Sequence, residues 1–538
     1  MDGFESMSDT LDYMKMFAHF PSALRHFQRR TLTLNEAKRI VHDRMERREE
    51  TFLRIAERKI YGNPQSPYLA LLKWAGCELG DLGALVKRNG LEDALRELRK
   101  EGVYVSYEEF KGRKPLVRNG KTISVRARDF DNPRTRVGFT IESSGSTGLA
   151  STVNQDLDFL ADASTDLLLV HALYHVTNAP AAMWSSFLPG PGFRGVFQMN
   201  YIGQPLSKWF APSGWRDSKF WVKYDLATLY MLSWMRVFGY RAPMPQVVRP
   251  EQALTVAHWV AETLKTHRRC LLIAGVSRAL RVCLAAEEAG LDLNGVVIRI
   301  GGEPVTLSKV RAMEHAGARL MSVYAMTEAG SIARSCAASS DPGDLHLTKD
   351  LHAMIVHPYQ IPGSEVTVPA FNLTSLLESA PKVLLNVQLD DYGILEERAC
   401  GCEFESFGYT THLREIRSYS KLVSEGATLI GTDMLDILER VLPARFGGTS
   451  LDYQLIEQED EQGFTRLCLL IHPRLEIADE GTVIKVVLNA LGRSSPMADA
   501  ARTMWQNAQT FQVQRKAPLW TASGKLTPLH LQRHRQDS

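Results

Sequence analysis

Apolar and polar residues follow two alternating patterns in the middle of the chain. Between residues 252 and 325, segments with apolar residues every three or four positions alternate with short, nearly continuous apolar runs. The first pattern predicts amphipathic helices, and the second predicts buried strands. The predicted helices are 252–266, 277–289 and 307–316, and the predicted strands are 270–274, 296–300 and 319–323. This alternation is typical of an α/β fold with a largely parallel sheet.

The residues before this region differ in pattern. Residues 1 to about 100 contain charged segments with helical periodicity, which predict a mostly helical extension. Residues 103–141 favour strands, and residues 156–175 predict a helix rich in leucine and alanine. Between 180 and 244 the chain is rich in Trp, Phe, Tyr, Pro and Gly, which is compatible with a substrate pocket or with ordinary core.

The C-terminal part predicts a second, smaller unit. A helix at 433–441, a strand at 467–471 and a helix at 482–491 indicate an α+β domain. We therefore expect a large N-terminal domain, residues 1–417, with mostly parallel sheets flanked by helices. Residues 418–538 would form a small C-terminal domain.

Composition narrows the function classes. The chain has 538 residues, a length that exceeds what a single hydrophobic core usually holds, and 44% of the residues are hydrophobic. Because 63 basic residues nearly balance 61 acidic ones, no overall positive field favours nucleic acid. The start of the chain is acidic and polar, unlike a secretory signal, and the apolar run 167–174 is too short to span a membrane. We expect a cytoplasmic protein, and the composition predicts no particular oligomeric state.

A small, hydroxyl-rich segment follows the predicted strand that ends near residue 141. It consists of Ser143, Ser144, Gly145, Ser146, Thr147 and Gly148. The glycines let successive backbone N–H groups turn toward one point, and the hydroxyls add donors, so the segment can cradle a phosphate. The helix at 156–175 would cover it with a favourable dipole. A flexible surface turn is the alternative, and the P-loop is excluded because no Gly-Lys-Ser/Thr follows.

Two further motifs stand where predicted parallel strands end. Gly301-Gly302-Glu303-Pro304 follows the strand at 296–300, and Tyr324-Ala325-Met326-Thr327-Glu328 follows the strand at 319–323. Open α/β sheets bind ligands outside the carboxyl ends of their strands. Both motifs are therefore expected to face one crevice.

Five ordered motifs resemble those of the adenylate-forming superfamily, which includes acyl-CoA synthetases, peptide-synthetase adenylation domains and luciferases. They are SSGSTG, GGEP, YAMTE, the turn Asp390-Asp391-Tyr392-Gly393 and the segment Thr521-Ala522-Ser523-Gly524-Lys525. Arg417, nine residues before Gly426, also resembles an arginine of these enzymes. The resemblance covers about residues 134–525, and the phenylacetate-CoA ligase and acyl-protein synthetase branch is the most similar. One departure is that Leu149 follows Gly148, where many relatives have Pro-Lys.

The resemblance implies how ATP would bind. The β- and γ-phosphates would contact Ser143, Ser146 and Thr147. Tyr324 would lie against the adenine ring, and the backbone of Gly302 and Glu303 would border its other side. Asp391 and Arg417 would hold the ribose.

The resemblance also implies the catalytic groups. Thr327 would bond the α-phosphate, Glu328 would bind Mg²⁺, and Lys525 would be the catalytic lysine. Lys525 would reach the nucleotide on a mobile C-terminal lid that rotates about a hinge at residues 418–420.

The implied activity is that of an AMP-forming carboxylate ligase. A carboxylic acid and ATP would give acyl-AMP and pyrophosphate, and the acyl group would pass to the thiol of CoA or of a carrier protein's phosphopantetheine. The aromatic residues between Trp184 and Trp234 suggest an aryl or apolar acid. Transfer to an amine or to a protein cysteine is an alternative, as is a non-catalytic nucleotide-binding relative.

Four residues could form a structural zinc site. Cys400 and Cys402 flank one glycine, and Cys336 and His346 lie ten positions apart beyond the Thr-Glu motif. Three thiolates and one imidazole are a usual tetrahedral zinc set, and some phenylacetate-ligase-like proteins look similar here. Free thiols, with His352 and His357 as alternative ligands, are the competing interpretation.

Overall fold

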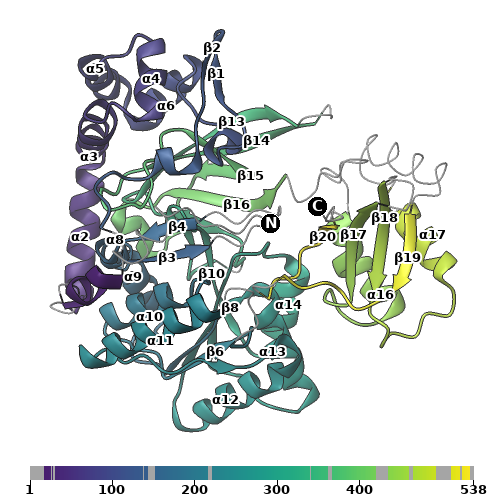
Figure 1. Cartoon of the computed structure of the whole chain (residues 1–538). Coiled ribbons are helices and arrows are strands. Elements are labelled where there is room, and N and C mark those ends of the chain that lie inside the picture. The colour runs from purple at the N-terminus through teal and green to yellow at the C-terminus, as the bar shows by residue number, and fades with distance from the viewer. Residues whose placement is uncertain are drawn as a thin grey trace.

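The computed structural model shows a large body and a smaller C-terminal unit (Figure 1). It describes residues 17–25, 27, 31–136, 138–142, 152–215, 221–339, 341–361, 366–419, 434–459, 465–491, 511–521 and 524–532. A 12-stranded sheet runs through the large body, and a separate four-stranded sheet forms the C-terminal unit. The predicted α/β class, with a large helix-flanked sheet and a small second unit, is confirmed.

The parallel part of the large sheet corresponds to the region of alternating helices and strands. Its order is β10-β9-β8-β5-β6-β7, and all five neighbouring pairs are parallel. These strands are β5 (Ala181–Trp184), β6 (Lys208–Ala211), β7 (Gln246–Val247), β8 (Cys270–Gly275), β9 (Val296–Gly301) and β10 (Arg319–Met326). The three predicted strands of this region lie within one to three residues of the observed bounds, because near-continuous apolar runs mark strands buried on both faces.

The other half of the sheet is antiparallel, a distinction that the sequence pattern did not make. Its order continues from β10 as β11-β12-β16-β15-β14-β13. The strands are β11 (Gly330–Ser335), β12 (Leu345–Leu347), β13 (His352–Gln360), β14 (Thr367–Ser375), β15 (Val387–Glu397) and β16 (Thr411–Ser418). Consecutive strands pair with each other here, and the pairing of β12 with β16 joins the four strands β13 to β16 to the rest of the sheet.

Helices cover both faces of the parallel part. One face packs against α12 (Ala253–Thr266), α13 (Val276–Glu288) and α14 (Leu307–His315). The other face packs against α8 (Leu157–Asp162), α9 (Thr165–Leu173), α10 (Gly192–Tyr201) and α11 (Trp221–Val237). Apolar side chains of β8 and β9 alternate between the two cores: Leu271 belongs to one and Leu272 to the other.

The N-terminal extension is mostly helical, as predicted. It contains α2 (Leu34–Glu46), α3 (Arg48–Ile55), the π-helix η1 (Ala56–Tyr61), α4 (Pro67–Trp74), α5 (Leu79–Asn89) and α6 (Leu91–Lys100). It packs on the antiparallel strands through a shared core. The short helix α7 (Tyr107–Phe110), the 3-10 helix η2 (Ala127–Phe130) and the hairpin β1 (Leu116–Arg118) and β2 (Lys121–Ile123) follow.

A second strand, which the sequence did not predict, separates the hydroxyl-rich segment from the helix. β3 (Phe139–Glu142) pairs antiparallel with β4 (Thr152–Gln155), and α8 begins directly after β4. The hydroxyl-rich segment between the two strands lies outside the described residues, so its coverage by α8 stays a prediction.

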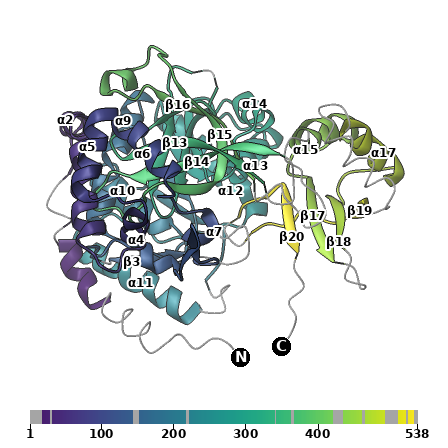
Figure 2. The ribbon, with the colours of Figure 1, turned by 90° about the horizontal axis from the view of Figure 1, so that it is seen from above.

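The C-terminal unit has its own core. Its sheet has the order β19-β18-β17-β20. The elements are α15 (Met434–Asp436), the π-helix η6 (Ile437–Val441), α16 (Leu442–Phe446), β17 (Tyr453–Glu459), β18 (Thr465–Ile471), α17 (Glu480–Leu491), β19 (Phe511–Arg515) and β20 (Leu529–Gln532). Figure 2 shows this unit beside α13 and α14, seen from above.

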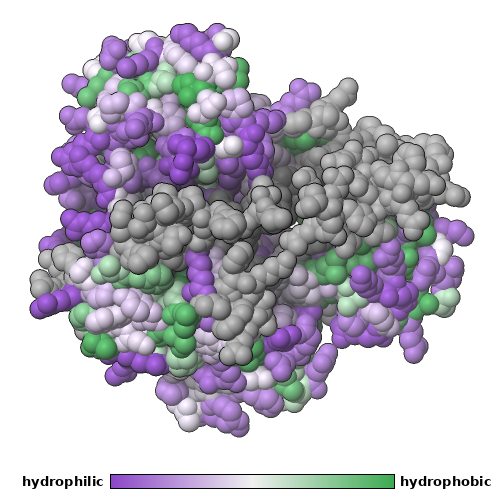
Figure 3. Space-filling model, in the orientation of Figure 1, coloured by the Kyte–Doolittle hydropathy of each residue, from purple (hydrophilic) through white to green (hydrophobic). Residues whose placement is uncertain are grey.

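The surface is largely hydrophilic on the face shown in Figure 3, with hydrophobic side chains in small groups, some of them over the region of α10 and α11. Leu226 and Val237 of α11 are 60% and 71% exposed. Within the described part of the chain, no helix has the length and hydropathy needed to cross a bilayer.

A buried ion pair connects the C-terminal unit to the large body. Lys309 Nζ of α14 lies 2.8 Å from Glu439 Oε1 of η6, and both side chains are less than 10% exposed. Thr306 and Ser308 donate hydrogen bonds to the second oxygen, Glu439 Oε2. Because one carboxylate satisfies three groups of the large body, this contact depends on the docked position of the unit.

We predict that Glu439→Ala releases the C-terminal unit. The substitution leaves the Lys309 ammonium buried without its carboxylate, a loss of about 3–5 kcal/mol for a buried pair, which undocking would relieve by hydration. Small-angle X-ray scattering should show an increased radius of gyration. Arg440→Ala, which removes an exposed pair with Asp436, is the control and should leave the scattering unchanged. Identical scattering for Glu439→Ala and the unaltered protein would refute the prediction.

Candidate active site

The GGEP and YAMTE motifs lie side by side at the carboxyl ends of β9 and β10. Gly301 pairs with Val323 in the parallel register, so the turns that follow the two strands are neighbours. Gly302 has a φ of +77°, a conformation that side chains disfavour, which explains a glycine at this turn. The expectation that the two strand ends share one edge of the sheet is confirmed.

The Glu303 side chain turns toward helix α13. Its carboxylate accepts hydrogen bonds from the Ser277 backbone N–H, at 3.3 Å, and from the Ser277 hydroxyl. A carboxylate is stabilised at the N-terminal end of a helix by the unpaired N–H groups there. The side chain therefore fixes the GGEP turn to α13, while the backbone of Gly302 and Glu303 borders the strand ends.

Tyr324 and Asp391 are joined by a hydrogen bond. Tyr324, near the end of β10, donates its hydroxyl to Asp391 Oδ2 on β15 at 2.7 Å. Burial, together with the Asp391 carboxylate, raises the pKa of Tyr324 well above its usual value, so the phenol stays protonated. Two residues that were predicted to contact the nucleoside, 67 positions apart, thus lie together.

Arg417 occupies a different face of the strand pair. It pairs with Tyr392 across β15 and β16, while Asp391 pairs with Ser418. Directly opposed residues of antiparallel strands point to the same side, and successive residues point to opposite sides. Arg417 therefore shares a face with Tyr392 and not with Asp391. The structure does not bring the two predicted ribose ligands onto one face.

Thr327 and Glu328 form the turn between β10 and β11. Glu328 is 3% exposed, and its Oε1 lies 2.6 Å from Lys111 Nζ, just after α7. Lys111 Nζ also lies 5.6 Å from the ring centroid of Tyr107 of α7, whose pKa is raised by burial and by the carboxylates of Asp390 and Glu328. Helix α7 thus covers the Thr-Glu turn, and sequence inspection missed Lys111 because its partner lies 217 positions away.

Lys525 reaches the GGEP turn from the C-terminal unit. A Cβ atom added to Gly302 would lie 3.1 Å from Lys525 Nζ, so the ammonium group is in contact with this turn. The preceding Gly524, with a φ of +71°, lies against Arg278 of α13, and Trp520 packs on Arg281 at 4.0 Å. Lys525 is 222 positions after Glu303 in the sequence, yet both lie at the same turn.

The remaining residues predicted to bind phosphate, Ser143, Ser144, Gly145, Ser146, Thr147 and Gly148, lie outside the described residues, as does residue 420 of the predicted hinge. Ser418 and Tyr419 of that hinge are described. The Ser418 hydroxyl and the Tyr419 backbone N–H both donate to Asp390, the residue before Asp391.

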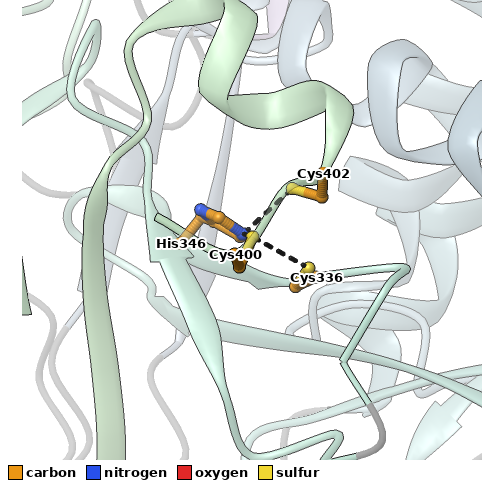
Figure 4. Close-up of side chains that lie close together, drawn as sticks. All are labelled: Cys336, His346, Cys400 and Cys402. Atoms are coloured by element: carbon orange, nitrogen blue, oxygen red, sulfur yellow. Dashed lines mark hydrogen bonds between the residues drawn. The ribbon is translucent and has the colours of Figure 1, made fainter. Parts of the chain in front are cut away.

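A second cluster joins all four residues of the predicted zinc site (Figure 4). Cys336 follows β11, His346 is on β12, and Cys400 and Cys402 precede the 3-10 helix η4 (Glu403–Phe407). Their donor atoms lie within 4.8 Å of one another. His346 Nε2 is 3.5 Å from Cys400 Sγ and 3.3 Å from Cys402 Sγ, and Cys336 Sγ is 3.6 Å from Cys400 Sγ.

The donor set of this cluster fits a tetrahedral zinc ion. Ligands about 2.0–2.3 Å from zinc are about 3.5–3.8 Å apart along the edges of a tetrahedron, close to the observed separations. His346 Nδ1 is 2.6 Å from the Tyr409 carbonyl oxygen, which fixes the proton on Nδ1 and leaves Nε2 directed at the thiols. The alternative ligands His352 and His357 are not in this cluster.

The fold of the chain is similar to that of solved structures. Two crystal structures of 2-hydroxyisobutyryl-CoA ligase in the postadenylation state are similar to the whole chain. One, in complex with 2-HIB-AMP, has a TM-score of 0.56 and 11% sequence identity, with 94% of this chain and 91% of that chain covered. The other, in complex with R3-HIB-AMP, has a TM-score of 0.54 and 12% identity, covering 91% and 90%. The chain has the fold of the adenylate-forming enzymes. No protein-family model and no curated protein sequence matches it.

The docking of the C-terminal segment can be tested at Gly524. A methyl group at this position would lie 2.7 Å from Arg278 Nη1, whereas at Gly290, which also has a positive φ, it would meet no atom within 4 Å. Gly290→Ala should cost about 1 kcal/mol of unfolding free energy from backbone strain alone.

We predict that Gly524→Ala is measurably more destabilising than Gly290→Ala and that it increases hydrogen exchange in the segment 511–532. Urea unfolding and hydrogen-exchange mass spectrometry check the two expectations. Equal effects of both substitutions would show that Gly524 does not press against Arg278 in solution.

Proposed function

We propose that this protein is an ATP-dependent carboxylate ligase. It would adenylate a small carboxylic acid, release pyrophosphate, and then transfer the acyl group to a thiol, either that of CoA or that of a carrier protein's phosphopantetheine. The observation that carries the proposal is the contact between Lys525 and Gly302, which brings a cation from the C-terminal unit to the adjoining ends of β9 and β10. The fold shared with 2-hydroxyisobutyryl-CoA ligase supports it.

The charges at this site suit the reaction. A carboxylate that attacks the α-phosphorus of ATP brings two anions together, so the site must neutralise charge and hold the reactants in line. The Lys525 ammonium would stabilise the negative charge on the α-phosphate and on the attacking carboxylate. Thr327 would donate its hydroxyl to the same phosphate. Exclusion of water by the docked C-terminal unit would strengthen these interactions.

The nucleoside would bind between the described turns. Tyr324 directly follows Val323, which pairs with Gly301, and its hydrogen bond to Asp391 holds that carboxylate in place. Asp391 would then accept hydrogen bonds from the ribose hydroxyls. Arg417 could join it only after the strand pair or the C-terminal unit moves, because the two side chains are on opposite faces.

Glu328 is the candidate ligand for Mg²⁺. Hard divalent cations prefer carboxylate oxygens, and Glu328 offers one at the strand end beside Thr327. When bound, Mg²⁺ would neutralise part of the phosphate charge. Lys111 contacts Glu328 Oε1 and would keep the carboxylate oriented.

We predict that Lys525→Ala lowers acid-dependent exchange of pyrophosphate into ATP by about 10²–10³-fold, the usual cost of removing one charge-stabilising donor. The assay uses the acid that gives the fastest exchange among a panel. Lys516→Ala, in the same C-terminal unit, is the matched control and should retain exchange. Undiminished exchange by Lys525→Ala would exclude the proposed role.

The acyl acceptor needs a separate assay. Acyl-AMP formed in the first step should be consumed when the correct thiol is added, so formation of a thioester with CoA, or with a phosphopantetheinylated carrier protein, identifies the acceptor. The proposed cytoplasmic location suits either thiol. The phenylacetate-CoA ligase branch of the superfamily predicts CoA.

A structural zinc ion is the second element of the proposal. Cys336, His346, Cys400 and Cys402 would hold it, joining β11 and β12 to the segment before η4. Because β11 directly follows the Thr327-Glu328 turn, such a link would stiffen the strand that carries this turn.

We predict about one zinc per chain by elemental analysis, as expected for a closed four-ligand site. Cys402→Ser should lower the zinc content at least fivefold and reduce the unfolding temperature. Cys468→Ser, a buried cysteine of β18 outside the cluster, should keep the metal. A zinc-free protein purified without chelators, or equal metal content in both variants, would reject the site.

A further inference from the structure

Three arginine side chains meet beneath the two strand-end turns. Arg194 comes from α10, Arg299 from β9 and Arg334 from β11, all on the face of the sheet that α8 to α10 cover. Arg299 pairs in register with Met321, and Arg334 with Val323. Burial and the neighbouring arginines lower the pKa of Arg299 to about 9 and that of Arg194 to about 10, so both remain charged near neutral pH.

One carboxylate lies among these arginines. Asp166 of α9 is fully buried and accepts a hydrogen bond from Arg334 Nε through its Oδ2. Asp166 also attracts Arg194 and Arg299. Three guanidinium groups therefore face a single carboxylate, which leaves two positive charges unmatched by Asp166.

The other acidic groups nearby already have cationic partners. Glu328, which Arg194 approaches, is paired with Lys111. Asp162 and Asp350 face the single guanidinium group of Arg44 at 2.9 Å and 3.6 Å. With these pairs included, the cations named here still exceed the carboxylates by one.

His171 adds no negative charge. Its Nδ1 lies 2.9 Å from Gln204 Oε1, and the Gln204 amide nitrogen donates to two backbone carbonyls, so His171 Nδ1 carries the proton. Burial together with Arg299 lowers the pKa of His171 to about 3, and the ring is neutral. Its Nε2 lies buried and, like Arg299 Nη1, has no hydrogen-bond partner within the described residues.

Four side chains on this face are partly exposed near the carboxyl ends of the strands. In the middle of the sheet, Leu271, Val297 and Met321 are at most 1% exposed. Two residues further along the same face, Ile273, Arg299 and Val323 are partly exposed, as is Arg194 of α10. Together they present two aliphatic and two cationic side chains.

We propose that the far end of the acyl substrate binds against these side chains and that the substrate is a dicarboxylic acid. This inference rests on the proposed function and names its substrate class. One carboxylate would react beside Thr327 and Lys525, and the second would pair with Arg299 and Arg194. A guanidinium group binds a carboxylate through two parallel hydrogen bonds, and a buried charge requires such a partner.

The position along the strand limits the length of the acid. Arg299 stands two residues before Gly301 on β9, which corresponds to about 6–7 Å at 3.3 Å per residue. A chain of a few carbons or one aromatic ring between the two carboxylates suits this separation. The aliphatic surfaces of Ile273 and Val323 would pack against that carbon skeleton.

The test compares acids in matched pairs: butanedioate with butanoate, pentanedioate with pentanoate, and benzene-1,4-dicarboxylate with 4-methylbenzoate. Acid-dependent exchange of pyrophosphate into ATP gives kcat/KM for each. In the unaltered protein, we expect the diacid of at least one pair to exceed its monoacid by about tenfold or more, because a buried polar site rejects an analogue that leaves it unpaired.

Arg299→Met retains much of the side-chain length but removes the charge, and it should lower kcat/KM for that diacid at least tenfold while changing the monoacid by less than threefold. Arg299→Lys keeps the charge and should retain part of the preference. Arg311→Met, an exposed arginine of α14, is the matched control. A preference for monoacids, or an equal loss for both acids in Arg299→Met, overturns the inference.

Calorimetric binding of each acid without ATP separates this inference from the proposed function. Exchange with monoacids alone overturns the dicarboxylate site and leaves the ligase activity standing. If a diacid binds only when Arg299 is present but never supports exchange, the dicarboxylate site is supported and the proposed adenylation is excluded. Absence of both binding and exchange with every acid overturns both.

Discussion

The contact between the Gly524-Lys525 segment and the turn after β9 is the constraint on which the rest of the site depends. It brings one ammonium group from the C-terminal unit to the edge where two parallel strands end. Reaction between a carboxylate and a phosphate requires cations on several sides, and Lys525 is the cation that the C-terminal unit would add. The position of the C-terminal unit therefore decides whether the site is complete.

Two features hold the unit in this position. Glu439 satisfies Lys309, Thr306 and Ser308 on the large body, and Trp520 packs on Arg281. Arg281 is on α13, which follows β8. Lys309 and Ser308 are on α14, which follows β9, and Thr306 directly precedes α14. The sheet thus sets the turns that carry the candidate site and also the surface on which the C-terminal unit docks. A rotation of this unit would withdraw Lys525 and separate Glu439 from Lys309 in the same movement.

Much of the fold could be predicted where local pattern and burial agree. Helical periodicity before residue 100 agrees with helices such as α6, which begins after Gly90, and the strands β8, β9 and β10 follow from apolar runs buried on both faces. The β3–β4 hairpin could not be predicted, because the short polar strand β4 has no apolar run that distinguishes it from a loop. The antiparallel half of the sheet pairs consecutive strands except where β12 pairs with β16, and that pairing has no local signal in the sequence.

Single motifs located the strand-end turns, but the partners that surround them come from distant segments. Lys111 beside Glu328, Arg278 beside Gly524 and Asp166 beside Arg334 have no spacing rule that relates them in sequence. Arg299 did carry a signal: a charge inside the run Val296-Val297-Ile298-Arg299-Ile300 has no place in a sealed core unless something pairs with it. The cysteines of the candidate zinc site were found by spacing, since two of them flank one glycine.

Transfer of a carboxylate oxygen from the acid to AMP tests most directly whether the protein forms an acyl-AMP. An acid that supports exchange is labelled with ¹⁸O in its carboxyl group and incubated with the protein, ATP, Mg²⁺ and an acceptor thiol, and the products are analysed by mass spectrometry. Attack of the carboxylate on the α-phosphorus predicts that one ¹⁸O atom appears in AMP and none in pyrophosphate. Label in inorganic phosphate with formation of ADP, or unlabelled AMP, would contradict the account.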